Sequence, residues 1–193
     1  KIEFITNLLE NTFDTKMRSH RAGRWAFNET YAKIINQFGY LVDCSVTPHI
    51  ILDKKCNYNG EFKTISYCGY PNTPYFVDLD NINKMDSSSS LLEIPLSIII
   101  DDETILSYLR RFFSEESILI SILNRITSNP LILRPDGNNL IKMKKILNNA
   151  TICNWPCVEL MLHSSELMPG GNPYFPHEED IEKLYRDIED IFE

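Results

Sequence analysis

The sequence predicts an α/β protein that forms a single domain over residues 1–193. Two observations support this fold class. Short apolar runs with the length of strands alternate with segments whose apolar residues recur at helical spacing. Such alternation is typical of βα units around a mostly parallel sheet. The chain is also long enough, with 43% hydrophobic residues, to bury one core.

The first part of the chain predicts two helices and a strand. A helix opens the chain, and a second helix begins after Asn28, a residue that can cap it. Gly39 ends this second helix, and residues 40–42 form a short strand that leads to Asp43. The apolar faces of the two helices consist of Ile5, Leu8, Leu9 and Phe13, and of Tyr31, Ile34, Ile35 and Phe38.

The middle of the chain predicts a long loop and a buried strand. Residues 49–90 are expected to be mostly loop, because Pro, Asn, Gly and Tyr recur there. The most apolar run, residues 91–100, predicts a buried strand that carries Glu93, and Pro95 indicates a strand end or a sheet edge. The acidic residues that follow suit the beginning of a helix, which we expect to run to about Arg125.

The last part predicts two strands, each followed by a helix. Residues 131–133 form a strand closed by Arg134, and a later apolar run forms a strand that ends at His163. The two helices have apolar faces at Leu140, Met143 and Leu147, and at Ile181, Leu184, Tyr185, Ile188 and Ile191. We expect the strands to end on a common face, at Arg21, Asp43, Ser97, Arg134 and His163.

Charge and cysteine content restrict the class of protein. The formal net charge is −8, which argues against a broad nucleic-acid or anionic-membrane surface. No apolar run is long enough to cross a bilayer, and no secretory signal precedes the first helix. The five cysteines form no Cys-x-x-Cys pair, which favours a reducing compartment over a disulfide framework or a zinc knuckle. We therefore expect a cytoplasmic protein, with association with the cell envelope left open.

His163 is the first candidate for chemistry, because it lies where a buried strand runs into a loop. In α/β folds, sites form where strands end and loops begin. An imidazole titrates near neutral pH and can therefore donate or accept a proton. Ser164 and Glu166 follow it with a hydroxyl and a carboxylate. The alternative is a structural histidine that is hydrogen-bonded near a strand end.

Arg21, Arg24 and Trp25 form a second candidate cluster around Gly23. An arginine near a strand end can pair with a carboxylate or bind another anionic group through its planar fork. An exposed tryptophan beside it is a platform for a sugar ring. The alternative is two surface charges beside a core tryptophan.

Three further residues have polar side chains in places that need an explanation. Asp43 ends a strand and could act in catalysis, pair with an arginine or cap a turn. Glu93 lies in an apolar run, where a carboxylate needs a partner or a raised pKa. Tyr75 belongs to an aromatic, proline-containing loop that either lines a groove or packs down as a lid. The sequence contains no His-x-x-x-His motif, no Gly-x-Ser-x-Gly turn and no phosphate-binding loop.

Four segments resemble, in the same order, motifs of the polysaccharide-deacetylase (NodB-homology, carbohydrate esterase family 4-like) family. They are Ser19-His20-Arg21-Ala22-Gly23-Arg24-Trp25, Gly39-Tyr40-Leu41-Val42-Asp43-Cys44-Ser45-Val46, Leu92-Glu93-Ile94-Pro95 and Leu162-His163-Ser164-Ser165-Glu166-Leu167. The resemblance spans nearly the whole chain and is to a branch found in bacterial surface-polysaccharide gene sets. It implies an irregular, incomplete (β/α) barrel, because the family's first strands have no counterpart in this chain.

The resemblance implies hydrolysis of an N-acetyl group, a carbon–nitrogen bond, on a surface glycan. Arg21 matches the arginine that holds the catalytic base, His163 the general acid of a Leu-x-x-His motif, and Trp25 an aromatic residue of the substrate groove. The residue before the motif arginine is usually Phe, and here it is His20. The expected catalytic residues are Arg21, His163 and Asp43, and the expected substrate-binding residues are Trp25, Arg24, Tyr75, Ser164 and Glu166.

The metal-binding motifs of the family precede the arginine segment and have no match in this chain. We therefore expect no metal ligands here, and a divalent, zinc-like ion only where the N-terminal part of such a domain is present. Missing barrel strands would leave an unpaired sheet edge, which favours a homo-oligomer or another partner. The alternative function is a catalytically inactive, metal-free module that binds a glycan or a partner.

Overall fold

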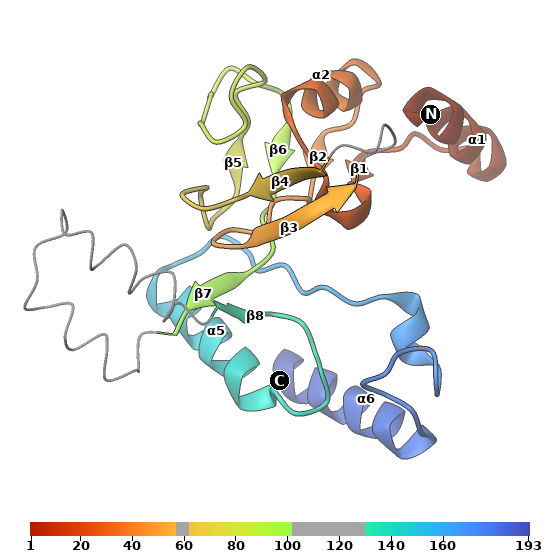
Figure 1. Ribbon diagram of the computed structural model, residues 1–193, viewed down its shortest axis with the longest axis vertical. Coiled ribbons are helices and arrows are strands. Elements are labelled where there is room, and N and C mark those ends of the chain that lie inside the picture. The colour runs from red at the N-terminus through yellow and green to blue at the C-terminus, as the bar shows by residue number, and fades with distance from the viewer. Residues whose placement is uncertain (57–61, 102–129) are drawn as a thin grey trace, which may run out of the picture.

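The computed structural model describes residues 1–56, 62–101 and 130–193, which form a mixed α/β structure (Figure 1). The helices are α1 (Ile2–Phe13), α2 (Glu29–Gln37), α5 (Leu140–Ile152) and α6 (Glu178–Phe192), with short 3₁₀ helices at Gly23–Trp25 and Ser164–Leu167. The strands are β1 (Ser19–His20), β2 (Val42–Asp43), β3 (Ile51–Cys56), β4 (Phe62–Ser66), β5 (Tyr75–Phe76), β6 (Leu92–Glu93), β7 (Ile98–Ile100) and β8 (Pro130–Ile132). None of the helices in these ranges has the length and hydrophobicity needed to cross a bilayer.

The largest sheet has the strand order β1-β2-β6-β5 and is parallel in its first three strands. β5 joins β6 in the antiparallel direction, so parallel pairing is confined to β1, β2 and β6 among the described strands. The register places His20 opposite Asp43, and Asp43 opposite Glu93. Because residues at the same level of neighbouring strands share a face, three titratable side chains form one row across this sheet.

Two antiparallel pairs correct the predicted strand pattern. β3 pairs with β4, a hairpin that the prediction of mostly loop for residues 49–90 did not include; outside β3, β4 and β5 the described residues of this range are indeed mostly loop. β7 pairs with β8 in a separate sheet, and the apolar run at 91–100 is therefore two strands divided around Pro95, which has no N–H to donate. None of the three described sheets is closed. The helix predicted to run to Arg125 lies outside the described residues.

α2 begins and ends where the sequence predicts. Asn28 Oδ1 accepts a hydrogen bond from Tyr31 N at 2.9 Å, which satisfies one of the unpaired N–H groups of the first turn. Gly39 follows the helix with a φ of +80°, a conformation that favours glycine. Ala32 and Ile35 on its inner face are fully buried.

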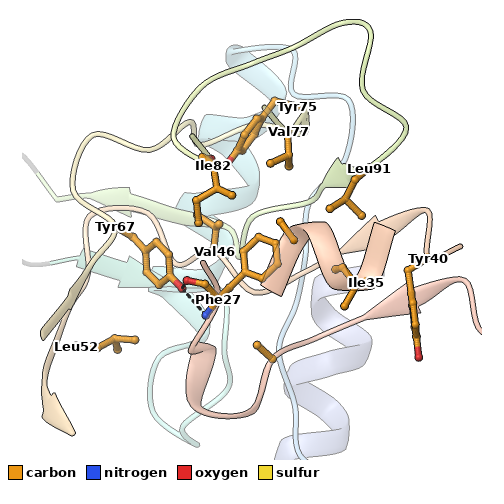
Figure 2. Packing of buried hydrophobic residues seen from close by; sticks show 12 residues of the cluster. Phe27, Ile35, Tyr40, Val46, Leu52, Tyr67, Tyr75, Val77, Ile82 and Leu91 are labelled. Atoms are coloured by element: carbon orange, nitrogen blue, oxygen red, sulfur yellow. Dashed lines mark hydrogen bonds between the residues drawn. The ribbon is translucent and has the colours of Figure 1, made fainter. Parts of the chain in front are cut away.

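The N-terminal core lies between α2, the four-stranded sheet and the β3–β4 hairpin (Figure 2). Tyr67 follows the hairpin, and its side chain points toward Phe27, whose backbone N–H donates to Tyr67 Oη at 3.2 Å. Tyr75 is also buried here, and its hydroxyl donates to Ile82 O at 2.7 Å. The buried residues of this core are Ala22, Phe27, Ala32, Ile35, Tyr40, Val46, Leu52, Tyr67, Tyr75, Val77, Ile82 and Leu91.

The C-terminal part of the chain builds smaller clusters around α5 and α6, below the four-stranded sheet in Figure 1. Met143 and Ile146 of α5 pack with Leu133 after β8. Leu184 of α6 is buried as predicted, whereas Tyr185, which the sequence placed on the same face, is exposed.

α1 lies at the edge of the molecule (Figure 1) and exposes its apolar residues. Phe4, Ile5 and Leu8 are more than half exposed. The helix contacts the rest of the protein through Thr6, which is buried and whose hydroxyl is hydrogen-bonded to that of Tyr40 at 2.9 Å. The helix itself is therefore as predicted, but its apolar face is turned away from the core.

The strand predicted to end at His163 is an extended segment without regular pairing. Its Glu159 carbonyl accepts a hydrogen bond from Ser97 N at 3.3 Å, and Met161 N donates to Leu133 O at 3.1 Å. These two bonds hold the segment between the residues that precede β7 and those that follow β8. They position His163 without a full ladder of strand hydrogen bonds.

Candidate functional site

A pocket of about 400 Å³ lies where three distant segments of the chain meet. The loop after β1 contributes residues 21–25, the chain after β8 contributes Arg134, and the extended segment contributes Met161 and His163. Arg21 and His163, which are far apart in sequence, therefore line the same pocket. Asp43 and Ser97, predicted at the same face, are buried and are not among the lining residues.

The loop that follows β1 has two residues in an unfavourable backbone conformation. Arg24 and Trp25 have φ values of 58° and 52°, in the left-handed region that residues with a Cβ rarely adopt. Such a residue costs about 1–3 kcal/mol and persists only where its surroundings enforce it. Here Trp25 O accepts a hydrogen bond from Tyr67 Oη at 2.5 Å, and Trp25 N donates to Ala22 O at 3.0 Å. These hydrogen bonds hold Arg24 and Trp25 in this conformation in the wall of the pocket.

Arg21 is held by groups of this chain. Its Nε donates to Cys44 O at 3.0 Å, and its Nη2 forms an ion pair with Glu159. The resemblance assigns Arg21 to a base carboxylate from a preceding segment, whereas the carboxylate that it contacts here comes from the extended segment. Burial raises the pKa of the Cys44 thiol to about 11, so this neighbour remains protonated and unreactive at neutral pH.

His163 lies against a buried carboxylate and a second arginine. His163 Nδ1 is 3.3 Å from Glu166 Oε1 and 3.3 Å from Arg134 Nη2. Arg134 Nη2 in turn donates to Glu166 Oε1 at 2.5 Å. The side chain of Glu166 is fully buried, while that of His163 is 55% exposed. The imidazole is thus fixed at one edge and open to the pocket at the other.

The position of Nδ1 between a donor and an acceptor suits both protonation states of the ring. The neutral form with its proton on Nε2 can accept from Arg134, and the imidazolium can donate from Nδ1 to Glu166. Nε2 has no hydrogen-bond partner among the described residues. His163 can therefore present a proton at Nε2 to a group in the pocket.

Glu166 is the residue that holds this arrangement together. Its Oε2 accepts a hydrogen bond from the backbone N–H of His163 at 3.0 Å, and its Oε1 accepts one from Asn172 Nδ2 at 2.8 Å. Burial raises the pKa of Glu166, but the hydrogen bonds from His163 and Arg134 outweigh it and leave the pKa below its ordinary value. Glu166 is therefore an ionised partner of His163, with its oxygens facing protein donors rather than the pocket. Ser164 is exposed on the adjoining 3₁₀ helix and does not line the pocket.

Asp43 belongs to a second, fully buried polar cluster. Its Oδ1 is 2.5 Å from His20 Nδ1 and accepts from Ser45 Oγ at 3.0 Å, and its Oδ2 accepts from Ser45 N at 3.0 Å. Ser45 Oγ also accepts from Ala22 N at 2.7 Å. Asp43 is therefore not placed to contact a substrate in the pocket. It supports the base of the loop that carries Arg21 and Trp25.

Glu93 lies beside Asp43 in the same row and is fully buried. Its Oε1 accepts from Val46 N at 2.8 Å, while its Oε2 has no hydrogen-bond partner. Burial, followed by the neighbouring Asp43 carboxylate, raises the pKa of Glu93 well above its ordinary value. Glu93 is thus best held in its neutral form, so that the two adjacent acids share a single negative charge.

The structure changes the membership of the predicted site. Tyr75 lies in the N-terminal core, where its hydroxyl is already hydrogen-bonded to Ile82 O, and is not among the lining residues. Arg134 and Glu159 join the site instead. Arg134 was recognisable as a polar residue closing an apolar run, the same signal that identified His163. Glu159 carries no such signal, because only the fold brings it to Arg21.

The described residues do not provide the ligands of a divalent metal. No three His, Cys, Asp or Glu side chains within residues 1–56, 62–101 and 130–193 come together in a way that could hold an ion. His20 and Asp43 are bound to each other, and Glu166 is occupied by Arg134 and Asn172. The metal that the family resemblance implies therefore does not fit these residues, and the chemistry below uses only the side chains of the pocket.

Comparisons of the chain with models of protein families, with curated proteins and with solved structures found no match.

Proposed function

We propose that this protein is a carbohydrate deacetylase-like hydrolase. Its pocket binds an N-acetylated glycan, and His163 protonates the departing amine. The observation that carries this proposal is the meeting of Trp25, Arg21 and His163 in one pocket of about 400 Å³. A tryptophan at a pocket wall offers a flat apolar face to a sugar ring. A half-exposed imidazole fixed by a buried carboxylate offers a proton beside it.

Hydrolysis of an N-acetyl group adds water across the amide bond. The water's hydroxyl goes to the carbonyl carbon, which leaves as acetic acid, and the proton that the water gives up replaces the one that the sugar nitrogen takes up. The amine is a poor leaving group unless it is protonated. His163 Nε2 can supply that proton, after which the neutral ring keeps its remaining proton on Nδ1 and donates it to Glu166. Arg134 limits the movement of Glu166 during this change and so keeps the ring in place.

Binding is tested directly by the fluorescence of Trp25. The chain has two tryptophans. Trp155→Phe therefore leaves Trp25 as the only tryptophan and leaves every residue that lines the pocket unchanged. We expect a saturable fluorescence change with the N-acetylated tetrasaccharide chitotetraose and a weaker response to its fully deacetylated counterpart. Titration of the Trp25→Ala variant, measured by calorimetry, should show about tenfold weaker binding, because an aromatic contact contributes roughly 0.5–1.5 kcal/mol beyond the apolar area that it buries.

Turnover is tested by acetate release from the same tetrasaccharide with the full-length protein. Acetate release that depends on His163 would support hydrolysis. Saturable binding without any acetate release would instead support the glycan-binding module without hydrolytic activity. Absence of binding to both neutral and acidic N-acetylated oligosaccharides at millimolar concentration would contradict both.

A further inference from the structure

The pocket contains one positive charge more than its ion pairs neutralise. Its lining includes Arg21, Arg24 and Arg134 and no carboxylate. Glu159 neutralises Arg21 and Glu166 neutralises Arg134. Arg24 forms no ion pair with any described residue. A free guanidinium thus lines a pocket in a chain whose net charge is −8.

The backbone holds this free arginine at the pocket. Arg24 and Trp25 are consecutive, and both have the left-handed conformation described above. Residues with a Cβ rarely adopt this conformation, and it persists only where the surrounding structure enforces it. In this loop the hydrogen bonds of Trp25 with Tyr67 and Ala22 enforce it. Arg24 and Trp25 are therefore consecutive residues in the wall of the pocket.

We propose that the substrate is an acidic glycan, in which a sugar ring packs on Trp25 and a singly charged group of the same or the next sugar pairs with Arg24. This inference rests on the proposed function and specifies its substrate class. One uncompensated guanidinium matches one negative charge, and its planar N–H groups match an anion that presents two oxygens side by side. A carboxylate of a uronic acid and a sulfate ester share this chemistry.

The test compares three oligosaccharides on the Trp155→Phe protein. Chitotetraose is neutral, a hyaluronan tetrasaccharide carries carboxylates beside N-acetylglucosamine, and a 6-sulfated N-acetylglucosamine tetrasaccharide carries sulfate esters. We expect at least one acidic ligand to bind about tenfold or more tightly than chitotetraose at low salt, because a hydrogen bond to a charged group contributes roughly 1.5–3 kcal/mol. The arm with the larger gain identifies the acidic group. Only the binding of the acidic ligands should weaken when the salt concentration rises.

Two substitutions of Arg24 and one control complete the test. Arg24→Asn removes the charge while tolerating the left-handed conformation, and it should abolish the preference for acidic ligands. Arg24→Lys keeps the positive charge but loses the paired, planar N–H donors of the guanidinium. It should therefore retain only part of the preference for acidic ligands. Arg186→Gln, which removes an exposed positive charge on α6, should leave all three affinities unchanged.

The outcomes separate this inference from the proposed function. Equal binding of neutral and acidic ligands, or a preference that survives Arg24→Asn, would overturn the acidic substrate and leave the deacetylase-like function standing. Failure of all three ligands to bind would overturn the proposed function and the substrate class together. If Arg186→Gln lost the preference for acidic ligands as fully as Arg24→Asn, the preference would depend on the overall charge of the protein rather than on Arg24. That result would also overturn the inference.

Discussion

The protein contains two histidine–carboxylate pairs that are alike in chemistry and opposite in environment. His20 and Asp43 meet at 2.5 Å with side chains that are 13% and 0% exposed, inside the four-stranded sheet. His163 and Glu166 meet at 3.3 Å, and here the carboxylate is buried while the imidazole is open to the pocket. The carboxylate is fully buried in both pairs, but the imidazole of His163 opens into the pocket, whereas that of His20 is largely covered and does not line it.

The difference shows what makes such a pair suitable for chemistry. A buried carboxylate holds the ring in both cases, but of the two rings only that of His163 lines the pocket. The rings of Tyr31 and Tyr40 pack against His20 at centroid distances of 5.1 and 5.7 Å and help to enclose it. We therefore expect substitutions in the His20 pair to affect folding, and substitutions in the His163 pair to affect reaction.

The largest expected effect is on turnover. In the full-length protein, His163→Ala should lower the rate of acetate release from an N-acetylated glycan by about 10²–10⁴-fold, because the leaving amine loses its proton donor. Binding of the glycan and the urea midpoint should change little. His177→Ala, at the exposed beginning of α6, is the control. An unchanged rate in His163→Ala would remove the distinction between the two pairs.

The next largest effect is on stability. Asp43→Ala leaves His20 and Ser45 without their buried acceptor, which should lower the free energy of unfolding by about 3 kcal/mol in urea denaturation. Asp80→Ala is a matched control, because Asp80 also forms an ion pair, with Lys33, but is 86% exposed; it should cost less than about 1 kcal/mol. Equal losses in the two variants would show that burial of the Asp43 cluster is not what stabilises it.

The pH dependence of stability should distinguish the two clusters. The pKa of Glu93 is raised in the folded protein by burial and by Asp43, so its contribution to stability is present at low pH and is lost as pH rises. Glu93→Gln should therefore gain stability relative to the parent between about pH 5 and pH 8, by up to about 1.4 kcal/mol per pH unit. Parallel stability profiles for the two proteins in this range would contradict the raised pKa.

Glu166 should show the reverse behaviour, because its pKa is lowered in the folded protein. Its contribution to stability is present above the pKa of the unfolded chain and is lost as the pH falls through the lower, folded value. Relative to the parent, Glu166→Gln should be least stable near neutral pH, and the difference should shrink on acidification. Urea midpoints of both proteins from about pH 3 to pH 7 would measure this.

The smallest expected effect concerns Tyr75, which was predicted to bind substrate but lies in the N-terminal core. Tyr75→Phe removes the hydrogen bond to Ile82 O but leaves the ring in place, so it should lower the free energy of unfolding by about 1 kcal/mol. Glycan affinity should remain that of the parent, in contrast to Trp25→Ala. A clear loss of affinity in Tyr75→Phe, without a loss of stability, would return Tyr75 to the site.

Local sequence signals were sufficient for part of this structure. The cap at Asn28 and the glycine at position 39 locate α2, because helix ends depend on residues that are neighbours in sequence. Arg134 and His163 stood out because each follows an apolar run, and Arg21 and Trp25 because they cluster with Arg24 around Gly23. The four residues line one pocket. Periodicity likewise placed α5 and α6.

Only the tertiary structure decided which polar residues are buried and which remain accessible. Asp43 and His163 carry the same sequence signal, a polar residue at the end of an apolar run, yet the register of β1, β2 and β6 encloses Asp43 in a row with His20 and Glu93. The β3–β4 hairpin and the contact of Arg21 with Glu159 could not be predicted from the sequence either, because both depend on pairing between separate segments. Strand pairing and ion pairing join residues that are distant along the chain, and the free energy of each contact depends on the neighbours that exclude water from it.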